Sequence, residues 1–206
     1  MMNEPSACPV FSDDPKKQVI LEAALHEFAE KGYSGASTRS IASYAGVAHG
    51  LMYYYFKDKK TLFLQLSRLL REWVVNSVYD GLETNDVFAS MLDMCKKKLE
   101  LFSAYPSVYQ VVMEGVRYFP REFEADGKEI KRDVSVWTQF AQHGLTPHQR
   151  QTLEVMELAL EAMGDRYLAR YIGGELTANE MFKSGVQKAV ELIAYFKKVW
   201  QLPFGD

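Results

Sequence analysis

Apolar residues recur at helical spacing along most of the chain, whereas the alternating pattern of half-buried strands is scarce. Residues 15–31 are the first segment of this kind. Asp14 supplies an N-cap before it, Pro15 fits the first helical position, and Gly32 follows as a stop signal. We therefore expect a helix whose apolar face is formed by Val19, Ile20, Ala23, Ala24 and Phe28.

The same signals continue along the chain and predict an all-α fold of about nine helices. Two helix starts are especially clear, because Thr146 and Thr177 each have Gln or Glu three residues on, as in a capping box. The first three helices are expected to form a small module, which the long fourth helix joins to the rest. The ranges expected after the first helix are 38–44, 48–56, 58–79, 85–104, 107–118, 122–143, 146–172 and 177–198.

Composition and charge narrow the class of protein. Two cysteines, four histidines without metal-ligand spacing and no apolar run of about 18 residues predict a cytoplasmic protein without disulfide, metal, cofactor or membrane span. The net charge is −3, yet residues 31–60 carry five basic residues and one acidic residue. This local excess predicts an anion-binding module at 15–60, preceded by a disordered tail at 1–14 and followed by a larger domain at 61–206.

Residues 38–56 have the plan of a helix-turn-helix, with a short helix, a tight turn at 45–47 and a second short helix. Helical spacing places Met52 and Phe56 of the second helix on the face expected to enter the core. Basic side chains follow directly, in the sequence "KDKK" at 57–60.

The opposite face of this second helix is expected to contain Gly50, Tyr53 and Tyr54, with Tyr55 nearer the core. A glycine inside a helix costs about 1 kcal/mol relative to alanine, and close approach of another surface is one reason to keep it. Aromatic runs more often form core, and lysine clusters more often form a solvated face. The combination of outward tyrosines, glycine and local positive charge nevertheless favours contact with DNA.

The segment "GYSGASTRSIASYAGVAHGLMYYYFKDKKTLF", residues 32–63, resembles the DNA-binding segment of the TetR family of transcriptional regulators. The resemblance covers about residues 15–65. It implies a dimer whose helix at 48–55 enters the major groove, with Thr38, Tyr53, Tyr54 and Lys59 on phosphates. Together with the predicted faces, it assigns DNA contact to Ser37, Thr38, Arg39, Ala48, His49, Gly50, Leu51, Tyr53, Tyr54, Lys57 and Lys59.

The segment departs from the family pattern at three positions. Ala48 replaces a usual Ser, Leu51 a usual Thr and Ala36 a frequent Thr. Loss of the Ser cap is expected to cost about 1 kcal/mol of local helix stability. Leu51 can contact a thymine methyl instead of making a polar contact. The departures therefore concern the preferred operator rather than DNA binding.

The larger domain contains no catalytic constellation, and its aromatic residues and methionines suggest a site for an apolar or aromatic effector between helices. At helical spacing such residues more often form core, so both interpretations stay open. By resemblance, small molecules bind in this domain, and Glu114, Arg117 and His143 are candidate polar anchors. The ligand candidates are Met91, Phe102, Tyr105, Tyr109, Met113, Arg117, Phe123, Trp137 and Phe140.

Two long amphipathic helices at the end of the chain can pair with their copies as a four-helix bundle. A helix-turn-helix dimer must hold its reading helices about 34–36 Å apart, which favours this interpretation over simple coverage of the core. The predicted dimer residues are Leu153, Met156, Leu160, Met163, Tyr167, Met181, Gly185, Ala189, Ile193 and Phe196.

The sequence thus predicts a homodimeric repressor that a small effector releases from a palindromic operator. A transcriptional activator, or a regulator that has lost its ligand, is the alternative within the same class. A helical apolar-ligand-binding protein with a non-functional DNA module is the alternative from another class. An enzyme is disfavoured because no acid, base or metal constellation is present. The effector and the operator sequence are not encoded in these patterns.

Overall fold

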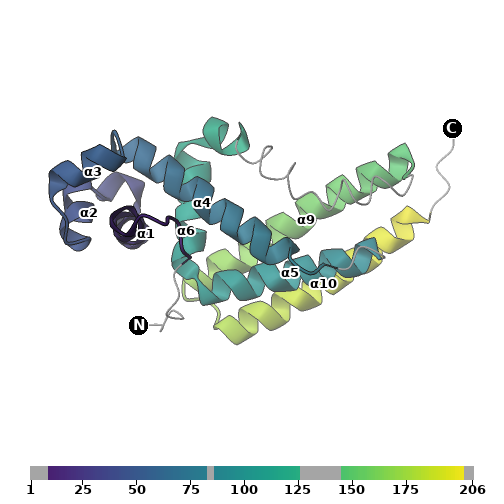
Figure 1. Cartoon of the computed structure of the whole chain (residues 1–206). Helices are drawn as coiled ribbons and strands as arrows, with labels where there is room; N and C mark the ends of the chain where they lie inside the picture. The colour runs from purple at the N-terminus through teal and green to yellow at the C-terminus, as the bar shows by residue number, and fades with distance from the viewer. Residues whose placement is uncertain (1–8, 83–85, 126–144, 202–206) are drawn as a thin grey trace. The chain divides into compact units, whose positions relative to one another are not determined.

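The computed structural model describes residues 9–82, 86–125 and 145–201. Every labelled element in these residues is an α-helix, and the all-α fold class is confirmed. None of the described helices combines the length and apolar character that a membrane crossing requires. In chain order the helices are α1 (Pro15–Gly35), α2 (Thr38–Tyr44), α3 (His49–Tyr55), α4 (Lys59–Tyr79), α5 (Val87–Ala104), α6 (Pro106–Tyr118), α9 (Pro147–Ile172) and α10 (Ala178–Trp200) (Figure 1).

Local sequence signals account for several helix ends. Asp14 caps α1 through hydrogen bonds from two backbone N–H groups, and Thr146 and Thr177 form the predicted capping boxes of α9 and α10. The end of α1 differs from the prediction. Gly32 has a φ of 66° and interrupts the helix as expected, but helical structure continues beyond it to Gly35. Gly32 is therefore a kink that only glycine adopts without strain.

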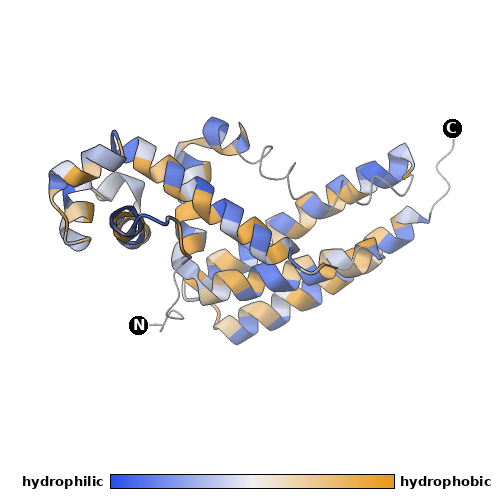
Figure 2. Ribbon diagram, viewed as in Figure 1, coloured by the Kyte–Doolittle hydropathy of each residue, from blue (hydrophilic) through white to orange (hydrophobic). Residues whose placement is uncertain are grey.

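The described residues form two compact units, each considered by itself. The first unit extends to Val75 and also contains α6, while the second contains 76–103, α9 and α10. Each helix of the first unit carries polar residues on part of its surface (Figure 2). Its core is formed by side chains that are at most 1% exposed, among them Ile20, Leu21, Phe28, Ile41, Met52, Phe56, Leu62, Phe63 and Leu66.

The position of α6 in the first unit was not predicted. The sequence prediction assigned 61–206 to one domain, whereas α6 packs against α1. The contact centres on Tyr33, whose ring lies 4.9 Å from the rings of both Phe63 and Phe119 and 5.3 Å from that of Tyr118. These aromatic contacts join α1 to the end of α6.

The core of the second unit contains most of the residues that were predicted to form the dimer surface. α9 and α10 pack against each other, and Met91 of α5 joins their buried cluster. Gly185 lets α5 approach closely, since a Cβ there would lie 2.8 Å from a methyl of Leu99. Met163 and Tyr167 are half-buried, and the other predicted dimer residues are buried within one chain: Leu153, Met156, Leu160, Met181, Gly185, Ala189, Ile193 and Phe196. The apolar stripes of α9 and α10 thus form intramolecular core.

Residues 9–14, which the sequence analysis assigned to a disordered tail, are hydrogen-bonded to α1. Gln18 Oε1 accepts hydrogen bonds from the N–H groups of Phe11 and Ser12 at 2.7 and 3.0 Å, and Gln18 Nε2 donates to the carbonyl of Pro9 at 3.2 Å. A single side-chain amide therefore holds this segment to α1. The predicted helix at 122–143 is described only at 122–125, where it is helical, so Trp137, Phe140 and His143 lie outside the described residues.

Candidate nucleic-acid interface

The three consecutive tyrosines of α3 have different environments, as the helical spacing predicted. Met52 and Phe56 are fully buried and fix α3 to the core, while Tyr53 and Tyr54 are 50% and 80% exposed. Tyr55 is half-buried. The exposed face of α3 therefore presents two phenol rings to the surroundings of the chain.

Gly50 lies on this exposed face without an intramolecular reason to be glycine. It is not among the glycines with positive φ, and a Cβ added to it would meet no described atom within 4 Å. Ala48, the N-cap residue of α3, makes no side-chain capping hydrogen bond. α3 thus has two features that lower its stability, an N-cap without a capping side chain and an internal glycine, and the packing within the chain explains neither of them.

A small polar cluster joins the start of α2 to α3. Thr38 Oγ1 lies 3.1 Å from His49 Nε2 and 3.4 Å from the hydroxyl of Tyr53. The rings of His49 and Tyr53 meet edge to face, with their centroids 5.0 Å apart. The neighbouring Ser37 hydroxyl caps α2, where it accepts a hydrogen bond from the N–H of Ser40 at 3.0 Å. The orientations of His49 and Tyr53 are therefore fixed within the chain.

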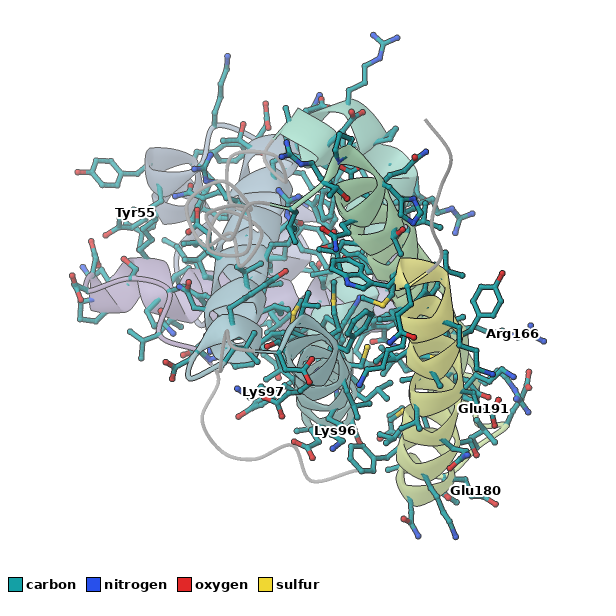
Figure 3. All side chains as sticks on the ribbon, turned by 90° about the vertical axis from the view of Figure 1, so that its right-hand side faces the viewer. Tyr55, Lys96, Lys97, Arg166, Glu180 and Glu191 are labelled. Carbon is teal, nitrogen blue, oxygen red and sulfur yellow. The ribbon has the colours of Figure 1, made fainter. Side chains whose placement is uncertain are left out.

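A second contact joins α3 to the start of α1. The hydroxyl of Tyr55, labelled in Figure 3, donates to Asp14 Oδ2 at 2.7 Å. This hydrogen bond lowers the pKa of the Asp14 carboxyl and raises the pKa of Tyr55. It also places the first turn of α1, with Lys16 and Lys17, beside α3. No sequence motif marks these two lysines, because they are separated from α3 by more than thirty residues of chain.

The lysines after α3 are not equivalent. Lys57 is exposed, whereas the Lys59 ammonium donates to the carbonyls of Tyr33 and Ala36 at 2.8 and 3.1 Å. Lys59 therefore holds the end of α1 and uses two of its three N–H groups there. Asp58 accepts a hydrogen bond from the N–H of Thr61 at 2.7 Å and so occupies the start of α4.

Comparisons with known proteins bear on this arrangement. Residues 20–66 match the family described as bacterial regulatory proteins, tetR family. The HTH-type transcriptional repressor AcnR of Corynebacterium efficiens is 26% identical over 183 residues, 86% of this chain and 89% of that protein. The HTH-type transcriptional regulator RutR of Escherichia coli K12 is 31% identical over 91 residues, 44% of this chain and 43% of that protein.

Solved structures agree with these matches. A TetR family transcription regulator from Marinobacter aquaeolei VT8 has a TM-score of 0.69 at 20% identity, over 87% of this chain and 96% of that one. Residues 20–66 thus match the TetR family, and over most of its length the chain resembles an HTH-type repressor and solved TetR-family regulators. It is a DNA-binding transcriptional regulator, and proteins of this family are generally not enzymes. Among its described residues, no three His, Cys, Asp or Glu side chains form a group able to hold a metal ion.

α6 contacts α1 through a hydrogen bond, and the residues that follow α6 contact α4 through an ion pair. Glu114 Oε2 accepts a hydrogen bond from the backbone N–H of Tyr33 at 2.7 Å, next to the kink at Gly32. Beyond the end of α6, Glu122 pairs with Lys60 of α4 at 2.8 Å. This contact raises the pKa of Lys60 and lowers the pKa of Glu122. A displacement of α6 would therefore disturb its contact with the end of α1 and the neighbouring contact with the start of α4.

The described ligand candidates are distributed over both units. Met91 and Phe102 are buried in the second unit; Tyr105, Tyr109, Met113, Arg117 and Phe123 belong to the first. Phe123 packs on Gly115, and its ring centroid lies 3.8 Å from the guanidinium carbon of Arg71. The Arg117 side chain is 74% exposed and lies 4.0 Å from Glu114. Phe123 is thus a core residue, and its assignment to an effector stays a prediction.

Proposed function

We propose that this protein is a homodimeric repressor of the TetR family that binds a palindromic operator through α3 and leaves it when a small apolar or aromatic effector binds. The exposed face of α3 supports DNA contact most directly. Tyr53 and Tyr54 offer hydroxyl donors for phosphate oxygens, and the open space at Gly50 lets the DNA approach the helix backbone. Half-exposed Leu51 lies beside them and can contact a thymine methyl.

Charged side chains around α3 complete the proposed surface. Arg39 and Lys57 are exposed, and Lys16 adds a third exposed cation that the position of α1 brings near. Arginine can donate two hydrogen bonds to the O6 and N7 atoms of guanine, whereas lysine contributes mainly by charge attraction to phosphates. The excess of basic residues at 31–60 would thus attract DNA phosphates, although the whole chain has a negative net charge.

The proposed dimer uses the outer faces of α9 and α10, because the inner faces are buried in the chain. Figure 3 shows Arg166 of α9 and Glu191 of α10 on the same side, so both helices can meet one partner. Exposed apolar residues on these helices are Val155, Leu158, Val190 and Tyr195, between 43% and 68% exposed. Such residues on two adjacent helices suit a four-helix bundle with a second copy.

The contacts of α6 support a route for release. An effector that binds the operator-free state more tightly shifts the regulator toward that state. Displacement of α6 would change the Glu114–Tyr33 hydrogen bond and the Lys60–Glu122 ion pair, and with them the position of α3. In the proposed mechanism α6 therefore acts together with α4.

Binding to DNA from the region upstream of the chain's own gene tests the proposal. Fluorescence anisotropy should show tight, sequence-selective binding that weakens steeply as salt increases, because phosphate contacts release counterions. Affinity that is independent of both salt and sequence would refute the proposal and favour an apolar-ligand-binding protein. A reporter behind the operator then distinguishes the two regulators, since a repressor lowers transcription and an activator raises it.

A further inference from the structure

Thr38, His49 and Tyr53 form a hydrogen-bonded cluster at the start of α2 and α3. We propose that it sets the tautomer of His49, so that His49 Nδ1 accepts a hydrogen bond from the amino group of an adenine or cytosine in the major groove. The inference rests on the proposed DNA binding and adds the chemistry of one operator position. The tautomer follows from which atom donates in each hydrogen bond of the cluster.

A DNA phosphate can only accept hydrogen bonds. If Tyr53 binds a phosphate, the phenol must use its single proton there. The contact of 3.4 Å between Tyr53 and Thr38 then requires Thr38 to donate to the Tyr53 oxygen. That uses the only proton of the Thr38 hydroxyl.

The remaining contact, of 3.1 Å between Thr38 Oγ1 and His49 Nε2, now requires the ring nitrogen to donate. Neutral histidine carries one ring proton, so Nε2–H leaves Nδ1 as an acceptor. No hydrogen bond to Nδ1 occurs among the described residues. The edge-to-face contact with Tyr53 also limits rotation of the His49 ring. His49 thus presents a fixed acceptor.

The position of His49 determines what this acceptor meets. His49 is the first residue of α3, and residues at the start of a recognition helix contact base edges in the major groove. There the base donors are the N6 amino group of adenine and the N4 amino group of cytosine, whereas guanine and thymine present acceptors. The cluster therefore selects adenine or cytosine and rejects guanine or thymine.

A double-mutant cycle between protein and DNA tests the inference. The preferred operator is first selected from random duplexes with the full chain, and the position relaxed by His49→Ala is identified. The base is then replaced by purine in place of adenine, or by 2-pyrimidinone in place of cytosine, which removes the amino group. We expect about 3- to 10-fold weaker binding for the unchanged protein and no further loss for His49→Ala.

Variants of Thr38 and Tyr53 separate this mechanism from a simple contact. Thr38→Ser keeps the hydroxyl and should keep the preference, whereas Thr38→Val should lose it. Tyr53→Phe frees the proton of Thr38 for His49, so the preference for an amino group should disappear while binding weakens on all sequences. Melting curves check that each variant is folded.

The outcomes distinguish this inference from the proposed function. A guanine or thymine preference at the relaxed position, or equal losses with and without His49, would overturn the tautomer mechanism while leaving DNA binding intact. Absence of sequence-selective binding by the unchanged protein would overturn the proposed function itself, and the inference with it.

Discussion

Replacement of Gly50 by alanine should have opposite effects on the stability of the protein and on its affinity for the operator. Glycine in a helix interior is less stable than alanine, and at Gly50 an added Cβ meets no described atom within 4 Å. The same methyl group would project from the face of α3 that we propose to approach DNA. Gly50→Ala therefore isolates the effect of bulk on that face.

Both magnitudes follow from these surroundings. The loss of backbone entropy at glycine predicts that Gly50→Ala stabilises the folded chain by about 0.5–1 kcal/mol, which raises Tm by about 1–4 °C. Forcing a methyl group into a closely packed contact typically costs about 1–3 kcal/mol. Operator affinity should then decrease by roughly 5- to 150-fold.

The assay measures Tm by circular dichroism and Kd by fluorescence anisotropy on the same preparations. Ala48→Ser is the matched control, because it supplies the missing N-cap and should stabilise α3 by about 1 kcal/mol without adding bulk at Gly50. Comparison of the two variants separates stiffening of α3 from steric exclusion of DNA.

Three results would refute the reasoning. Unchanged operator affinity in Gly50→Ala would mean that no DNA surface approaches this part of α3. A lower Tm would mean that the site is not open, so that packing within the chain explains the glycine. Weakened binding in Ala48→Ser as well would attribute the effect to stiffening.

Three further predictions concern contacts within and between chains. Glu114→Ala should leave the Tyr33 N–H without its acceptor, lower stability by about 1–2 kcal/mol and reduce effector-induced release from the operator, whereas Glu114→Gln keeps an acceptor oxygen and should change both quantities less in melting and release assays. The pKa of Asp14 is lowered in the folded chain, so its contribution to stability is present above its ordinary pKa and decreases as the pH falls through the lowered value. Asp14→Asn should accordingly flatten the acid side of a Tm-against-pH curve, and an unchanged curve would contradict this account. Leu158→Glu places a charge on the proposed dimer face and should yield a folded monomer with weak operator binding in analytical ultracentrifugation and anisotropy, while a persistent dimer would exclude that face.

Local features of the fold were predictable because they depend on neighbours in sequence. Caps at Asp14, Thr146 and Thr177 involve residues within three positions, and helical spacing separates Met52 and Phe56 from the exposed face of α3. The hydrogen bonds at residues 9–14 were not predicted. Gln18 holds that segment from inside the next helix, and its side chain carries no signal that distinguishes it from a solvated glutamine.

The amphipathic pattern of α9 and α10 determined which residues are buried, but not what covers them. An apolar stripe needs an apolar partner, and a second chain or another helix of the same chain satisfies this need equally. In the structure α5 and the two helices themselves supply the partner. The exposed apolar residues outside the stripe, such as Val155 and Leu158, became candidates for an interface only when the packing was known.

The helices, the helix-turn-helix and the division of α3 into a buried and an exposed face could be predicted from the residues alone, because they depend on spacing along one helix. Three contacts became known only from the packing of the helices: Lys59 holds the end of α1, Tyr55 binds Asp14, and Glu114 of α6 binds Tyr33. These groups are 26, 41 and 81 residues apart along the chain. Contacts at such separations depend on how helices pack, and no local pattern of residues encodes them.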